Sequence, residues 1–231
     1  DFCLSRGLGD VYKRQDSSVV IARPAVTTTY TVTGFDACTS QTRQVTVTVQ
    51  QPVGDPSVFP DNRWNVYAFN GRVLSNPTSG YLGFYTENNL NFNSRTRWAE
   101  GSGPGSANTT SGSAFQGCSV GVDQFSFAYK RRGFPCGRYS VDIPAHDDDV
   151  IMYVNGVEVF RHLGCCDAHS SVWTGYLSSN STVEIFVAEG NGSAYLAATF
   201  NRVSASTTIT PEQFICTGAS CLLYTSDAAD E

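Results

Sequence analysis

The chain has 231 residues, with 15 lysine and arginine residues against 21 aspartate and glutamate residues, so its formal net charge is −6. An acidic chain without a basic stripe cannot neutralise phosphates, which argues against nucleic acid as a partner. No run approaches the ~20 apolar residues that span a bilayer, so we expect no membrane insertion. Thr, Val, Ser, Gly and aromatic residues dominate, which is typical of short strands joined by tight turns.

Both ends of the chain resemble translated sequencing adapters. Residues 1–15 contain CLSRGLGDVYKRQ, and residues 221–231 read CLLYTSDAADE. A transposase mosaic-end DNA translates in these frames to VYKRQ and to CLLYTS. We therefore expect both segments to be adapter-derived and leave them out of the fold prediction. The alternative is a natural N-terminal segment and a natural acidic tail.

Residues 16–50 predict the last strands of a small sandwich. Residues 27–33 (TTTYTVT) and 45–49 (VTVTV) each alternate with period two, as the strands of a half-exposed hairpin do. The stretch resembles the end of bacterial immunoglobulin-like or polycystic-kidney-disease-type repeats, and residues 205–220 resemble the opening of another. About 35 residues cannot bury a core of their own, so we expect the rest of each repeat to lie outside this sequence. Cys38 and Cys216 would then each find a partner in its own repeat, although a bridge between the two is the alternative.

A central module is predicted over residues 57–200, after a segment of linker composition at 50–56. Asn155-Gly156 is a strong signal for a two-residue hairpin turn, and the Gly/Ser/Asn-rich residues 101–112 predict a surface loop. Short strands punctuated by turns indicate an all-β, antiparallel β-sandwich or jelly-roll domain. The predicted strands cover residues 63–69, 125–129, 137–143, 150–154, 157–160, 182–187 and 195–200.

Four cysteines lie within the central module: Cys118, Cys136, Cys165 and Cys166. No pair of them has the CxxC spacing of a zinc ribbon, so disulfides in an oxidising compartment are favoured, and we expect an extracellular or cell-surface location. A direct Cys165–Cys166 bridge would close a strained ring. Each is therefore expected to reach a different partner, either Cys118 or Cys136, with the pairing left open.

Three adjacent carboxylates, Asp147, Asp148 and Asp149, are placed between two predicted strands. They repel one another unless a cation compensates them, and calcium is a hard ion that prefers oxygen ligands. Adjacent aspartates on an extended turn point apart, so sharing one ion requires an unusual local backbone. A solvated acidic turn and a calcium site without sugar binding are the alternatives.

The segment DDDVIMYVNGVEV, residues 147–159, resembles the core motif of the protective-antigen-type (PA-fourteen) β-sandwich carbohydrate-binding domain: an aspartate pair, an alternating strand and an Asn-Gly hairpin. The segment VEIFVAEGNGSAYLAATF, residues 183–200, resembles the closing hairpin of that family. The Cys165-Cys166 pair is similar to that of its fungal adhesin members. The resemblance covers residues 120–200 well and the first half of the module loosely.

The resemblance implies a site. In lectin members of the family the aspartate pair, often joined by a cis peptide, holds a calcium ion that binds two sugar hydroxyls. Here Asp147 and Asp148 would be the ligands, with Asn191 or Glu189 from the closing turn as the third. Asp149 stands where the family usually has glycine, and it either adds a ligand or marks a different turn.

Two further sets of residues invite a functional reading. Trp173, Trp98 and Tyr176 offer faces on which a sugar can stack, although aromatic residues in a sandwich are more often core. His146, His162 and His169, with the two adjacent cysteines, offer zinc ligands; the Cys-Cys-x-x-His spacing is not a standard pattern, and disulfides compete for the thiols. We therefore retain Trp173 as a ligand-binding candidate and disfavour zinc.

The sequence thus predicts a calcium-dependent carbohydrate-binding or adhesion module of a large multi-domain bacterial protein, with a glycan or cell-surface polysaccharide as partner. We expect no enzyme activity, because clustered acids suit a cation better than the acid–base pair of a glycosidase, and the sequence has no GxSxG motif. The alternatives are a structural spacer, a protein-adhesion domain, or an accessory domain of a secreted glycoside hydrolase.

Overall fold

The computed structural model describes residues 2–5, 21–35, 39–75 and 79–203. These residues form three antiparallel sheets, and their helical content is limited to the two 3₁₀ turns Ser94–Thr96 and Pro104–Ser106. In the same residues, no helix has the length and apolar character needed to cross a membrane. The predicted class, an all-β antiparallel sandwich, is confirmed.

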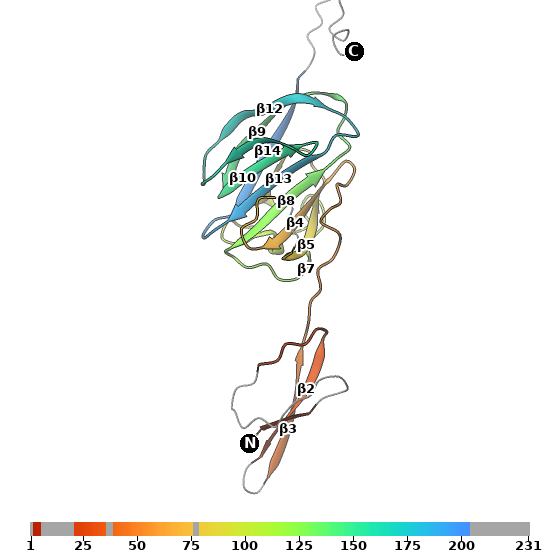
Figure 1. The fold of residues 1–231 in the computed structure, drawn as a ribbon, viewed down its shortest axis with the longest axis vertical. Helices are drawn as coiled ribbons and strands as arrows, with labels where there is room; N and C mark the ends of the chain where they lie inside the picture. The colour runs from red at the N-terminus through yellow and green to blue at the C-terminus, as the bar shows by residue number, and fades with distance from the viewer. Residues whose placement is uncertain (1, 6–20, 36–38, 76–78, 204–231) are drawn as a thin grey trace, which may run out of the picture.

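A three-stranded sheet lies at the N-terminal end, apart from the main body (Figure 1). Its strands, in the order β1-β2-β3, are β1 (Phe2–Ser5), β2 (Thr28–Phe35) and β3 (Ser40–Val47). The predicted hairpin is confirmed, but its second strand begins at Ser40 rather than at residue 45. Hydroxyl pairs across the hairpin, such as Thr29 with Thr46 at 2.9 Å between the Oγ1 atoms, accompany this pairing.

Several predictions lie outside the described residues: the repeat at 205–220, the segment 221–231, Cys38 and Cys216. In the segment 1–15, the structure describes only β1, which pairs with β2. This pairing does not test whether the segment comes from an adapter.

The main body is a sandwich of two sheets (Figure 1). The large sheet has the strand order β11-β10-β13-β8-β4-β5-β7, and the small sheet has the order β12-β9-β14-β6. The strands of the large sheet are β4 (Trp64–Asn70), β5 (Tyr81–Glu87), β7 (Gln116–Gly117), β8 (Phe125–Arg131), β10 (Asp149–Val154), β11 (Val157–His162) and β13 (Val183–Glu189). Those of the small sheet are β6 (Phe92–Asn93), β9 (Gly137–Asp147), β12 (His169–Leu177) and β14 (Tyr195–Val203).

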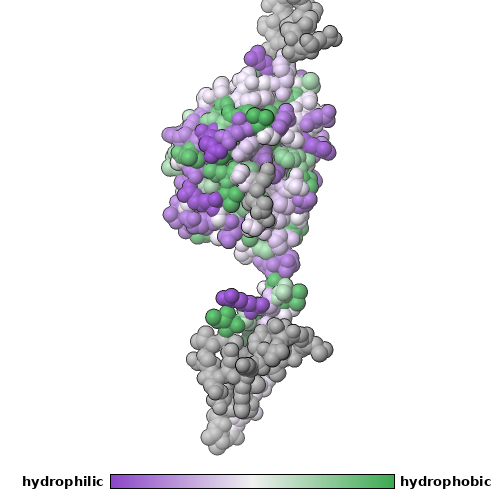
Figure 2. All heavy atoms as spheres, in the orientation of Figure 1, coloured by the Kyte–Doolittle hydropathy of each residue, from purple (hydrophilic) through white to green (hydrophobic). Residues whose placement is uncertain are grey.

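The core lies between the two sheets and is rich in aromatic side chains. Trp64 is fully buried at its centre, with ring centroids 5.3 Å from Phe92 and 5.4 Å from Phe200. Aromatic pairs at such distances add to the free energy gained by burying their surface. With the apolar sides packed inside, the outer face in Figure 2 is a mosaic of hydrophilic and hydrophobic residues.

A second apolar cluster covers the other side of the large sheet. Tyr67, Phe69, Ala128 and Phe186 are buried there. The predicted linker lies over this side, because the hydroxyl of Tyr81 donates to the carbonyl of Val53 at 2.5 Å. Strands β4, β8 and β13 are therefore buried on both faces, which explains their nearly continuous apolar runs.

The prediction of a surface loop at 101–112 is partly wrong. Gly103, Pro104 and Ala107 are buried, and a Cβ on Gly103 would lie 2.8 Å from the ring of Phe125. The segment covers one end of the core, so its Gly/Ser-rich composition reflects close packing as well as solvent exposure.

The predicted disulfide pairing is also wrong: Cys165 bonds Cys166, and Cys118 and Cys136 are free. Cys118 follows β7 at one edge of the large sheet, whereas Cys165 follows β11 at the other, six strand spacings or about 29 Å away. Cys136 lies just before β9. Cys166 lies near the other end of that strand, because its amide donates to the carbonyl of His146. The length of β9 therefore separates the two cysteines by roughly 30 Å. Because a disulfide requires Cα atoms within about 7 Å, neither pairing can form.

Candidate functional site

The candidate site lies where the β9–β10 turn meets the β13–β14 turn. β9 ends at Asp147 and β10 begins at Asp149, and the peptide between Asp147 and Asp148 is cis. β13 pairs with β10 and β14 pairs with β9, so the end of β13 is held beside the turn. As a result, the carboxylates of Asp147, Asp148 and Glu189 each place an oxygen within 4.8 Å of the others. We call these three residues the acidic cluster.

Glu189 is the most unusual member of the acidic cluster. Its side chain is fully buried, and neither carboxylate oxygen has a hydrogen-bond partner among the described residues. Burial, followed by the negative charges of Asp148 and Asp147, raises the pKa of Glu189 to about 7. A buried polar group left without a partner costs about 1–3 kcal/mol, and a charged one costs more.

Asp147 shares this environment. It is 8% exposed, and burial, then the hydrogen bond and charge of Asp148, raise its pKa to about 6. Two carboxyl groups with raised pKa values next to a third carboxylate form a centre of uncompensated negative charge. A bound cation would reverse this effect by favouring the ionised forms.

We predict that chelator-treated protein loses stability as the pH rises from about 4.5, the ordinary pKa of a glutamate, to about 7. When the pKa of an acid is higher in the folded state than in the unfolded state, its protonation stabilises the fold. This contribution is complete at pH values below the unfolded pKa, and it is lost as the pH rises through the folded pKa. The melting temperature measured from pH 5 to pH 8 in EDTA should therefore fall, and saturating calcium should flatten the decline. Identical profiles with and without calcium would contradict this expectation, and Glu189→Gln should flatten the EDTA profile.

A neighbouring loop fixes the β13–β14 turn. The Gly190 amide donates to Asp148 Oδ2 at 2.8 Å, and the Gly190 carbonyl accepts from the backbone amide of Gln124 at 3.1 Å. Asp123 accepts from the Gly192 amide at 3.1 Å, which brings a fourth carboxylate near the cluster. A Cβ on Gly190 would lie 3.0 Å from Asp148 Oδ2, so a glycine suits this close approach. Sequence reasoning missed Asp123 and Gln124, because they lie in a loop without periodicity.

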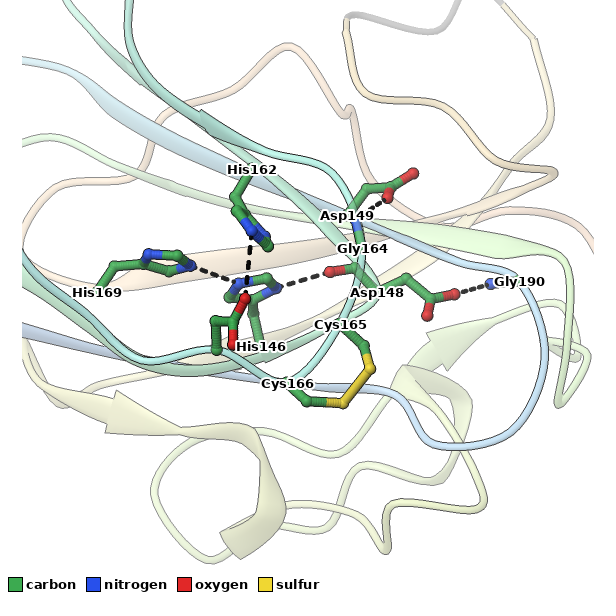
Figure 3. Close-up of a disulfide and its surroundings, with 10 residues drawn as sticks. His146, Asp148, Asp149, His162, Gly164, Cys165, Cys166, His169 and Gly190 are labelled. Atoms are coloured by element: carbon green, nitrogen blue, oxygen red, sulfur yellow. Dashed lines mark hydrogen bonds and ion pairs between the residues drawn. A yellow bond between two sulfur atoms is a disulfide. The ribbon is translucent and has the colours of Figure 1, made fainter.

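Asp149, predicted as a metal ligand, lies outside the acidic cluster. Its Oδ2 pairs with Arg72 Nη2 at 2.6 Å. Its Oδ1 accepts from the Gly164 amide at 2.7 Å (Figure 3). The charge of Asp149 is thus compensated by Arg72, and its carboxylate projects away from that of Asp148 (Figure 3). Arg72, like Asp123 and Gln124, is a residue that the sequence did not single out.

Trp173, predicted as a ligand-binding residue, is likewise not brought to the acidic cluster. It pairs with Val141 on β9, six residues or about 20 Å from Asp147, and its ring packs against the core. Trp98 is buried, with its indole N–H donating to the Ala194 carbonyl at 3.2 Å. Asn191 lies exposed in the β13–β14 turn, two residues after Glu189, and its role as a ligand stays a prediction.

The acidic cluster offers only oxygen donors. Carboxylates are the ligands that calcium prefers, whereas zinc and copper favour nitrogen and sulfur. The buried and uncompensated Glu189 is the observation that fits a hard cation, and Asp147, Asp148 and Glu189 are the residues that would hold it.

No protein-family model matches the chain, and no curated protein sequence matches it. Among solved structures, it is similar to the PA14 sugar-binding domain from an RTX adhesin, with 17% identity and a TM-score of 0.44, over 62% of this chain and 91% of that one. It is similar to the GH31 α-xylosidase from Xanthomonas citri, with 11% identity and a TM-score of 0.40, over 77% of this chain but 17% of the xylosidase. A third similar structure is the PA14 domain of the antifreeze protein MpAFP, with 13% identity and a TM-score of 0.34, over 67% of this chain and 90% of that one.

Proposed function

We propose that the central module is a calcium-dependent carbohydrate-binding module of a secreted or cell-surface protein. Asp147, Asp148 and Glu189 bind a calcium ion, and the ion binds hydroxyl groups of a glycan. The observation that carries the proposal is the buried Glu189 carboxylate, which has no hydrogen-bond partner among the described residues and faces two further carboxylates.

The position of the acidic cluster supports an ion that remains open to a ligand. Glu189 lies deepest, Asp147 is 8% exposed, and the adjoining Asn191 and Gly192 are exposed. Calcium accepts six to eight oxygen ligands, more than three carboxylates supply when each binds through one oxygen. Solvent or a pair of vicinal sugar hydroxyls can therefore complete its coordination, with Asn191 as a further donor.

The same geometry supports binding rather than hydrolysis. The two catalytic carboxyl groups of glycosidases stand about 5–9.5 Å apart, on either side of the scissile bond. Here three carboxylates offer oxygens within 4.8 Å of one another, an arrangement that suits the sharing of one cation. The disulfide between Cys165 and Cys166 supports an oxidising, extracellular location.

A glycan array probed with the full chain, in calcium and in EDTA, tests the proposal. We expect binding in calcium, loss of binding in EDTA, and loss in both conditions for Asp147→Asn. Asp61→Asn, which changes an exposed aspartate paired with Arg132, is the matched control and should bind as the wild type does. Calcium-dependent stability without glycan binding would instead favour a spacer or protein-adhesion module, and the absence of any calcium effect would overturn the proposal.

A further inference from the structure

The chain has three histidines, and all three meet at one place. His146 lies near the end of β9, His162 ends β11 and His169 begins β12. The ring centroids are 5.1 Å apart for His146–His162 and for His146–His169, and 4.6 Å apart for His162–His169. Figure 3 shows the three rings side by side, with the disulfide of the β11–β12 loop next to them.

The hydrogen bonds of His146 fix its tautomer. Its Nδ1 lies 2.6 Å from the backbone carbonyl oxygen of Asp148, and a carbonyl can only accept, so Nδ1 carries the proton. In the neutral ring, Nε2 then carries a lone pair and accepts a hydrogen bond from His169 Nε2. Metal-binding histidines are oriented in this way, with the second nitrogen donating to a carbonyl or carboxylate.

The acceptor nitrogen of His146 points at His169. The two Nε2 atoms are 3.0 Å apart, and one nitrogen from each of the three rings lies within 4.8 Å of the others. Tetrahedral zinc with Zn–N bonds of 2.0–2.1 Å requires nitrogens about 3.3 Å apart. Small side-chain movements therefore suffice to place three nitrogens around one ion.

His162 supplies the third nitrogen ligand, and the neighbouring Asp167 offers a fourth ligand. Its Nδ1 is buried without a hydrogen-bond partner among the described residues, and its Nε2 lies 3.4 Å from Asp167 Oδ2. Asp167 is exposed, so its carboxylate can orient the ring or complete the coordination.

We propose that His146, His162 and His169 form a zinc-type site, selective for divalent first-row transition ions, beside the acidic cluster but chemically distinct from it. Three imidazole donors suit zinc, nickel or copper and do not suit calcium, which requires oxygen. Because β11 belongs to the large sheet and β9 and β12 belong to the small sheet, the ion joins the two sheets at their edge. This inference differs from the sequence-based interpretation, because both cysteines are bonded to each other and the histidines alone provide the ligands.

Isothermal titration of the full chain with zinc chloride tests this site. Saturating calcium is present to occupy the acidic cluster, and free thiols are blocked with N-ethylmaleimide. We expect one zinc ion per chain and a higher melting temperature on zinc binding. His162→Ala and His169→Ala should each weaken zinc binding by at least about 100-fold, more than the loss of an orienting partner costs. Asp147→Asn is the matched control: it should lose the calcium response and retain the zinc response.

Nuclear magnetic resonance of the imidazole groups gives a readout that does not depend on variants. With three histidines in the chain, we expect three ring spin systems, and all three should shift together on addition of zinc. Absence of zinc binding, zinc binding unchanged in His169→Ala, or a shift of fewer than three rings would overturn the proposal and leave the histidines as a packed, hydrogen-bonded cluster.

Discussion

Replacing Glu189 with glutamine is expected to raise the melting temperature in EDTA at pH 7.5 and to lower it in calcium, relative to the wild type. Glutamine has nearly the same shape and no charge. Without calcium it removes a buried, unpartnered carboxylate that is repelled by Asp147 and Asp148. With calcium it removes a charged ligand. A residue with a purely structural role would shift the melting temperature in the same direction under both conditions.

The expected sizes follow from binding linkage. Calcium at about 100 times its Kd stabilises the wild type by about 2.7 kcal/mol, which is roughly 5–10 °C in melting temperature for a chain of this size. Calcium affinity depends strongly on the number of ligand charges, so we expect Glu189→Gln to weaken it by at least about 100-fold and to lose most of this gain. Glu158→Gln, which changes an exposed glutamate paired with Arg161, is the control and should respond to calcium as the wild type does.

Replacing Arg97 with alanine is expected to destabilise the sandwich by about 3–5 kcal/mol, the cost of removing one partner of a buried ion pair. The Arg97 side chain is fully buried. Its Nη1 atom lies 3.1 Å from Oε2 of Glu87. Its guanidinium also donates to the backbone carbonyl of Thr86 on β5 and to those of Asn108 and Ser113, so it joins the 107–113 segment to the large sheet.

Urea denaturation followed by tryptophan fluorescence measures this effect, because Trp64, Trp98 and Trp173 all lie in the sandwich. Arg161→Ala is the matched control, since it removes an arginine from an exposed pair and should change stability little. Equal unfolding midpoints for the two variants would show that the Arg97 network does not stabilise the segment.

Much of the sandwich is predictable from the sequence, because strand alternation and hairpin turns are local signals. β8, β10 and β13 lie close to the predicted ranges, and Asn155 and Gly156 have the positive φ angles, 50° and 78°, that a two-residue hairpin turn requires. β12 was missed, because HSSVWTGYL mixes polar and aromatic residues and its pairing with β9 shifts register between His169 and Trp173. β5 was missed because Gly83 interrupts its pattern.

The acidic cluster was predictable only in part. Asp147 and Asp148 are adjacent in sequence, and the family resemblance pointed to Glu189, 41 residues after Asp148. Their proximity depends on the pairing of β13 with β10, which no local pattern reveals. The histidine cluster was harder to predict, because its members come from three strands with no standard ligand spacing.

A crystal structure grown with calcium and a glycan from the array is the most direct test of the central claim. We predict one ion bound by Asp147, Asp148 and Glu189 at the calcium–oxygen distances of about 2.3–2.6 Å, with two sugar hydroxyls completing its coordination. A Glu189 carboxylate that remains without a cation in saturating calcium, or a glycan bound away from the acidic cluster, would contradict the account.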